Sequence, residues 1–227
     1  ARGGFFILLF QYFIFTLLFK ALFMNDDLKD DLQHIRKMME RSSRFISLSG
    51  LSGVVAGIIA LAGAAVAYFI YDVDGSNYFD GRPEIYDRSM ILKLFVLAII
   101  VLVAAVGAGI LFTIKKSRSK GLKIWTNTTR QLLTALGIPL IAGGLFCLAS
   151  LYQHYFAIVA PATLVFYGLA LVSAAKYTYS DIQNLGYCEI LLGIIALFLP
   201  GYGLLFWAAG FGLLHIIYGL VMYRKYE

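Results

Sequence analysis

The sequence predicts an all-α protein: a polytopic transmembrane helical bundle with six core spans, and an extra N-terminal span is one of the interpretations left open below. Of its 227 residues, 60% are hydrophobic and only 14% are charged, whereas a soluble domain carries about 25% charged residues. The apolar segments are about 20 residues long, which is enough to cross a bilayer as a helix. They are unbroken rather than alternating, so the pattern excludes the strands of an outer-membrane barrel.

The predicted spans follow one another along the whole chain. They cover residues 3–23, 45–71, 89–114, 131–152, 156–176, 187–200 and 202–223. The span at 187–200 is short, and Pro200 and Gly201 behind it are typical of a tight turn. The last two spans are therefore expected to form a helical hairpin with almost no loop.

Lysine and arginine are concentrated in alternate loops. Residues 24–44 contain five of them and residues 115–130 contain six. Lys176 begins a third such loop, and Arg224 and Lys225 follow the last span. Basic loops stay on the cytoplasmic side of a membrane. The core bundle, residues 45–227, is therefore expected to begin and end in the cytoplasm.

Residues 1–23 are expected to form an apolar N-terminal helix, which is rich in phenylalanine, unlike the later spans. Met24 opens a stretch that is typical of a natural start. Three interpretations of residues 1–23 stay open: a seventh span, a remnant of an expression vector, or a misassigned peptide from a neighbouring protein.

Residues 24–44 are expected to form a cytoplasmic amphipathic helix. Leu28, Leu32, Ile35 and Met39 recur at intervals of four, three and four, which places them on one helical face. Acidic residues at its start and basic residues at its end suit the helix dipole. The helix either lies on the inner membrane surface or docks a cytoplasmic protein partner.

Small residues are expected to hold the bundle together, because close contact replaces the hydrophobic effect between helices in lipid. Ser49, Gly53 and Gly57 recur every four residues along the first core span, and Gly212 lies on a similar stripe of the last span. This pattern favours packing within the chain, although a homo-oligomer is also compatible with it.

The candidate functional site is a polar cavity toward the cytoplasmic side of the last three spans. Ionisable residues inside an apolar span are rare and frequently functional. Glu189 and His215 are such residues, and Lys176 and Asp181 lie near the same side of the membrane. The group either binds a cation, proton or headgroup, or forms an interhelical hydrogen bond that fixes helix packing.

Other kinds of chemistry have little support in the sequence. The three histidines, His34, His154 and His215, are expected at different depths, so no metal site is predicted. No catalytic residues and no cofactor motif are found, and the basic charge is explained by membrane topology rather than by nucleic acid. Membrane lipids are the expected surroundings.

Two stretches resemble an uncharacterised family of small bacterial six-helix inner-membrane proteins. They are MNDDLKDDLQHIRKMMERSSRFISLSGLSGVVAGI, from Met24, and residues 160–227, which begin APATLVFYGLALVSAAKYTYSDIQNLGYCEI. The resemblance covers about residues 24–227 and leaves residues 1–23 outside. It implies a multi-pass protein of the bacterial inner (cytoplasmic) membrane, and it implies no activity.

Three functions remain open. The sequence favours a non-catalytic membrane protein that assembles with or regulates a partner through the amphipathic helix. The alternative is a carrier, or a lipid- or small-molecule-binding protein, that uses the cavity around Glu189 and His215. A membrane-embedded enzyme is the least favoured, because no nucleophile or metal set is present.

Overall fold

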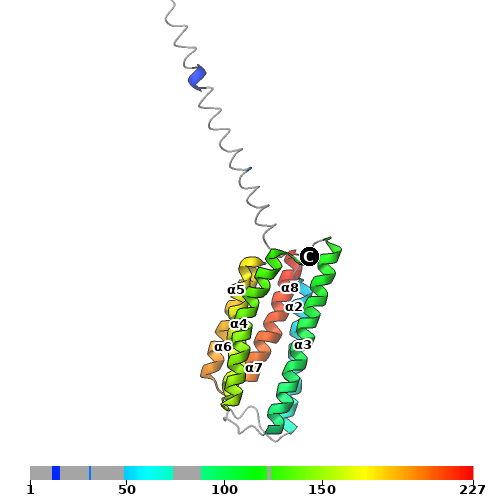
Figure 1. Ribbon diagram of the computed structural model, residues 1–227, viewed down its shortest axis with the longest axis vertical. Helices are drawn as coiled ribbons and strands as arrows, with labels where there is room; N and C mark the ends of the chain where they lie inside the picture. Colours follow the sequence, from blue (N-terminus) through cyan, green and yellow to red (C-terminus); the bar gives the residue numbers. More distant parts are fainter. Residues whose placement is uncertain (1–11, 16–30, 32–48, 74–87, 122–123, 227) are drawn as a thin grey trace, which may run out of the picture. The chain divides into compact units, whose positions relative to one another are not determined.

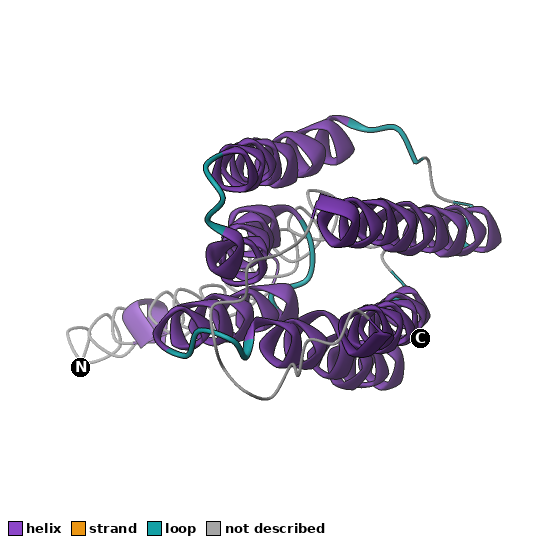
Figure 2. Cartoon of the chain, turned by 90° about the horizontal axis from the view of Figure 1, so that it is seen from below, coloured by secondary structure: helices purple, strands orange, loops and turns teal. Residues whose placement is uncertain are grey.

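The computed structural model describes residues 12–15, 31, 49–73, 88–121 and 124–226, and the regular elements among them are all helical (Figures 1 and 2). The chain divides into two compact units, Ala1–Ser43 and Arg44–Glu227. In the first unit, residues 12–15 and Asp31 are helical. The rest of the predicted helices at 1–23 and 24–44, including Leu28, Leu32, Ile35 and Met39, lies outside the described residues.

The second unit is a helical bundle. Its elements are α2 (Gly50–Val73), α3 (Arg88–Ser119), α4 (Asn127–Tyr152), α5 (Phe156–Ala174), the 3₁₀ turn η2 (Ala175–Tyr177), α6 (Asp181–Phe198), α7 (Gly203–Trp207), the π-helical segment η3 (Ala208–Leu214) and α8 (His215–Tyr226). The elements α7, η3 and α8 follow one another without a break and make one span, called the last span below. Among the described residues, six helices are long and apolar enough to cross a membrane, which confirms the predicted core. The protein is therefore a multi-pass helical membrane protein.

The predicted start of the sixth span at residue 187 is wrong, because α6 begins at Asp181. Gln183 and Asn184 lie in its first turn and are too polar to be counted in an apolar span, yet helical hydrogen bonding continues through them. Glu189 is therefore the ninth of the 18 residues of α6 rather than a residue of its first turn. The carboxyl group of Glu189 consequently lies near mid-span, deeper than expected.

The tight turn predicted at Pro200 and Gly201 is confirmed. The Tyr202 N–H donates to the Leu199 carbonyl at 3.2 Å, and Gly201 has a φ of 92°. Glycine adopts this left-handed region without the steric cost that a side chain brings. The turn folds α7 directly back along α6.

The start of α4 is closed by a capping box. Thr126 accepts from the Thr129 N–H at 3.2 Å, and Thr129 accepts from the Thr126 N–H at 3.4 Å. We expect Thr126→Ala to lower the free energy of unfolding by about 1 kcal/mol, because the Thr129 N–H at the start of the helix loses its acceptor. Thermal unfolding in detergent measures this loss. Asn127→Ala, one position inside the helix, is the control and should change stability less; equal losses in the two variants would contradict the capping role.

Two helices of the bundle, α5 and α2, each pack against neighbours on two sides. The helix α5 packs against α4 on one side and α6 on the other, whereas α2 packs against α3 and against η3 and α8 of the last span. The helices run roughly along one direction, and consecutive spans alternate in direction (Figure 1). One end of the bundle therefore gathers the start of α2, the start of α6 and the end of α8.

The small residues singled out in the sequence lie where α2 meets the last span. A Cβ atom on Gly57 would lie 2.7 Å from the Gly212 carbonyl oxygen, and one on Gly53 would lie 3.2 Å from the Gly219 Cα. Ser49 is buried just before α2, and its carbonyl accepts from the Ser52 hydroxyl at 2.6 Å. Only glycines allow these two backbones to approach so closely.

Candidate functional site

The candidate site is built around the carboxyl group of Glu189, which α6 places in the centre of the bundle. Glu189 lies on the same face of α6 as Gly186 and Gly193, and both glycines pack tightly against α5. The whole Glu189 residue is 0% exposed. A carboxyl group in such a place has no access to bulk water.

His215 of the last span lies opposite Glu189. Its Nδ1 is 3.3 Å from Glu189 Oε1 and 3.0 Å from the Gly210 carbonyl oxygen. Its Nε2 is 2.8 Å from the hydroxyl of Tyr167 on α5. The imidazole ring therefore links α5, α6 and the last span.

The contacts of His215 determine where its ring carries a proton. A carbonyl oxygen only accepts hydrogen bonds, so Nδ1 must donate to Gly210 and must carry a hydrogen. When the ring is neutral, Nε2 accepts from the Tyr167 hydroxyl, and when the ring is charged, Nε2 donates to it. Both protonation states of the imidazole keep both ring nitrogens hydrogen-bonded.

Glu189 is in a less favourable position than His215. Within the described part of the chain, both of its carboxyl oxygens are buried and have no hydrogen-bond partner. The N–H on His215 Nδ1 is directed to the Gly210 carbonyl and is only within ion-pair distance of Oε1. A buried polar group without a hydrogen bond costs several kcal/mol in hydrocarbon surroundings. A residue that is retained at such a cost is a functional candidate.

The π-helical segment shapes the wall of the site. A Cβ atom on Gly210 would collide with Glu189 Oε2 and with the Leu164 side chain, so only glycine leaves room for the carboxyl group. The segment spans Ala208–Leu214 and ends directly before His215. Short π-helical segments are rare and frequently occur at functional sites.

Lys176 and Asp181, which were expected in the same cavity, lie away from Glu189 and His215. Asp181 forms an ion pair with Lys225 at 2.9 Å and accepts a hydrogen bond from Tyr226. It precedes Glu189 on α6 by eight residues, or about 12 Å along the helix axis. Lys176 is exposed, with its Nζ 5.9 Å from the Tyr177 ring centroid. The structure therefore has an enclosed Glu189–His215–Tyr167 site and a separate ion pair at the bundle end.

Sequence reasoning missed Tyr167 and Gly210. Tyr167 lies in the middle of α5, whereas most tyrosines of this chain fall near span ends, and that position was the available signal. No sequence signal for Gly210 was available, because the chain contains many glycines inside apolar spans.

A stack of aromatic rings runs from the site along the last span. Trp207, Phe211 and His215 follow at intervals of four, with ring centroids 5.1 Å and 5.9 Å apart. The Tyr167 ring packs against Phe211 at 5.0 Å and against His215 at 5.3 Å. The stack connects the buried pair to Trp207, about 12 Å farther along the helix.

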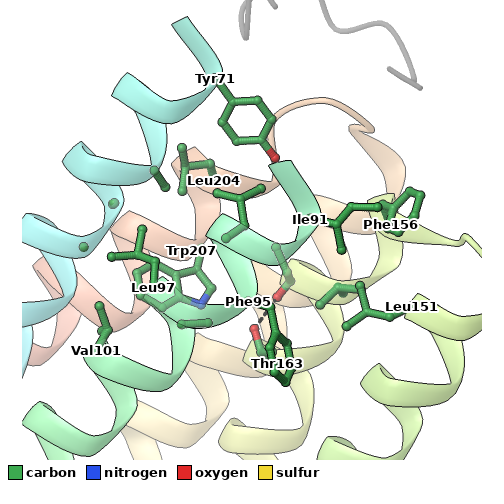
Figure 3. Close-up of a pocket in the computed structure, with 17 residues that line it drawn as sticks. Tyr71, Ile91, Phe95, Leu97, Val101, Leu151, Phe156, Thr163, Leu204 and Trp207 are labelled. Atoms are coloured by element: carbon green, nitrogen blue, oxygen red, sulfur yellow. Dashed lines mark hydrogen bonds between the residues drawn. The ribbon is translucent and has the colours of Figure 1, made fainter. Parts of the chain in front are cut away.

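Trp207 also lines an apolar pocket of about 250 Å³ between α2, α3, α5 and α7 (Figure 3). The α3 side of the pocket is formed by one helical stripe, which includes Ile91, Phe95, Ala98 and Val101. The Thr163 hydroxyl in the wall donates to the Ala160 carbonyl of its own helix at 2.7 Å. The pocket thus presents almost only hydrocarbon.

The described residues contain no group of three or more His, Cys, Asp or Glu side chains that could hold a metal ion. Comparisons with models of protein families, with curated proteins and with solved structures find no match for this chain. The fold and the site define a multi-pass helical membrane protein with a buried carboxyl–imidazole–phenol cluster.

Proposed function

We propose that this protein is a carrier or small-molecule-binding membrane protein whose buried Glu189–His215 pair binds a proton. The observation that carries the proposal is the fully buried Glu189 carboxyl group, which lies 3.3 Å from an imidazole nitrogen and whose two oxygens have no hydrogen-bond donor among the described residues. A pair that served only to hold helices together would be expected to satisfy its polar atoms. A proton is the ligand that fits, because the carboxyl group is fully enclosed and packs against Gly210.

A proton can rest on either member of the pair. When it rests on Glu189, the carboxyl group is neutral and the bundle centre carries no charge. When it rests on His215, an imidazolium faces a carboxylate, and the Tyr167 hydroxyl accepts the Nε2 hydrogen. The two arrangements differ in charge separation at mid-span, which is the kind of difference that couples proton binding to a conformational change.

Basic residues support an orientation for the protein. Lys115, Lys116, Arg118, Lys176 and Lys225 lie at the bundle end that holds the start of α6 and the end of α8. We place this end in the cytoplasm. The resemblance noted for residues 24–227 supports the inner membrane of a bacterium as the location.

Infrared difference spectroscopy across a pH titration tests the proposal. We expect the C=O stretching band of one protonated carboxyl group to appear and disappear with pH in the native protein. Glu189→Gln should remove this band, because the amide does not titrate. Asp181→Asn, which changes a carboxylate at the membrane surface, is the matched control and should keep it. Spectra of the native protein and Glu189→Gln that are identical at every pH would overturn the proposal.

Assembly with a partner through residues 24–44 stays a prediction, since that segment lies outside the described residues. Nothing in the described part of the chain favours an enzyme. The site geometry therefore favours ligand binding, rather than assembly with a partner, as the function of this protein.

A further inference from the structure

We infer that the pocket beside Trp207 holds an acyl chain of a membrane lipid and that its occupancy is coupled to the proton on the Glu189–His215 pair. The inference rests on the proposed proton binding for its second part. It adds the class of ligand and the structural route by which the ligand and the proton affect each other.

The chemistry of the pocket selects an apolar chain. Its wall is formed by the membrane-spanning helices, and in the described part of the wall only Tyr71, Thr163 and Trp207 carry polar side-chain atoms. Among the described residues no charged side chain lines it, so a headgroup or a polar solute would leave hydrogen bonds unmade against this wall. Its volume of about 250 Å³ is ample, because an apolar cavity of about 150 Å³ already binds benzene.

The length of the pocket matches one leaflet of a bilayer. On α3 the lining runs from Ile91, in the first turn, to Val101, a rise of about 15 Å. Half of a hydrocarbon core is also about 15 Å thick. Tyr71, Phe156 and Leu204 lie at the helix ends beside the first turn of α3, so the pocket begins at the membrane surface. A lipid chain that enters there extends to the middle of the bundle.

The aromatic stack joins the wall of this pocket to the proton site. Trp207 forms part of the pocket wall (Figure 3), and its ring packs on Phe211, which packs on both Tyr167 and His215. The ring of Trp207 therefore shifts with either event, through its contacts with the lipid chain or with Phe211. The π-helical segment between Trp207 and His215 is the backbone that accommodates the shift.

Few other titratable groups face the proton site. The face of α2 that meets the last span contributes Gly53, Gly57 and Leu61, none of which titrates. The Asp181–Lys225 ion pair lies about 12 Å away along α6. Among the described residues, Tyr167 on α5 is the titratable side chain that contacts the pair; Cys188 is exposed, and Tyr218 interacts with Asp181 and Cys188 instead.

Quenching of Trp207 fluorescence by brominated lipid tests the inference. The chain contains two tryptophans, so Trp125→Phe leaves Trp207 as the single reporter. The protein is placed in nanodiscs of phosphatidylcholine or of the same lipid brominated along one acyl chain. Ala98→Phe fills the pocket, and Ala104→Phe, on the same helix but outside the lining, is the matched control. We expect most of the quenching to be lost in Ala98→Phe and kept in Ala104→Phe.

The pH dependence of Trp207 quenching measures the coupling between the lipid chain and the proton. Quenching should change with pH in one step, and Glu189→Gln should remove the step. Equal quenching in Ala98→Phe and Ala104→Phe would overturn the lipid site, and Ala98→Leu repeats the comparison with a smaller side chain. Quenching that does not vary with pH, while the Glu189 infrared band titrates, would overturn the coupling and leave the proposed function in place. Absence of that band is a failure of the proposed function itself.

Discussion

Gly219→Ala is expected to lower the free energy of unfolding by about 3 kcal/mol, because overpacking between two backbones leaves nothing that can easily move. A Cβ atom on Gly219 would lie 2.6 Å from the Val54 N and 2.7 Å from the Gly50 carbonyl oxygen. Both neighbours are backbone atoms of α2, so relief requires the two helices to separate. Gly57→Ala meets the Gly212 carbonyl in the same way and should have a similar effect. Denaturation by a graded detergent mixture measures both losses.

The matched control for these substitutions is Gly107→Ala in α3. A Cβ atom on Gly107 meets nothing within 4 Å, so the substitution changes only helix propensity. It should stabilise the protein by up to about 1 kcal/mol. If Gly219→Ala were as stable as Gly107→Ala, the close contact between α2 and α8 would be wrong.

The spans of the core could be predicted because their signal is local. Length and apolar composition together decide whether a helix crosses a bilayer, and both are read directly from the sequence. The error at α6 has a physical cause: the helix extends through Asp181, Gln183 and Asn184 at the membrane surface, where polarity is no obstacle to helical hydrogen bonds. A boundary drawn at the first apolar residue is therefore late whenever a helix begins in the headgroup region.

The candidate site could be predicted only in part. Glu189 and His215 were found because an ionisable residue stands out in an apolar segment, and the structure brings them within 3.3 Å. Lys176 and Asp181 were grouped with them because the late boundary of α6 made Glu189 seem closer to the membrane surface. Tyr167 and Gly210 depend on the rotation of α5 and on a π-helical segment, and these are properties of packing between distant segments.

Glu189→Met is expected to raise the free energy of unfolding by about 2 kcal/mol, because it replaces an unsatisfied buried carboxyl group with an apolar side chain of similar volume. The substitution removes no hydrogen bond made by the Glu189 side chain in the described structure. His215 would keep its contacts with Gly210 and Tyr167. Thermal unfolding of the purified protein measures the gain, and the pH-dependent steps in the infrared and fluorescence signals should disappear in the same variant.

His215→Ala is expected to lower the free energy of unfolding, whereas Glu189→Met raises it. The alanine substitution leaves a cavity, removes the partner of the Tyr167 hydroxyl and takes away the imidazole nitrogen 3.3 Å from Glu189 Oε1, so a loss of about 3 kcal/mol is expected. A pair that only held the helices together would lose stability in both variants, since each removes one half of the same contact. Opposite signs would instead mean that Glu189 is retained against its own effect on stability, as a proton-binding residue would be.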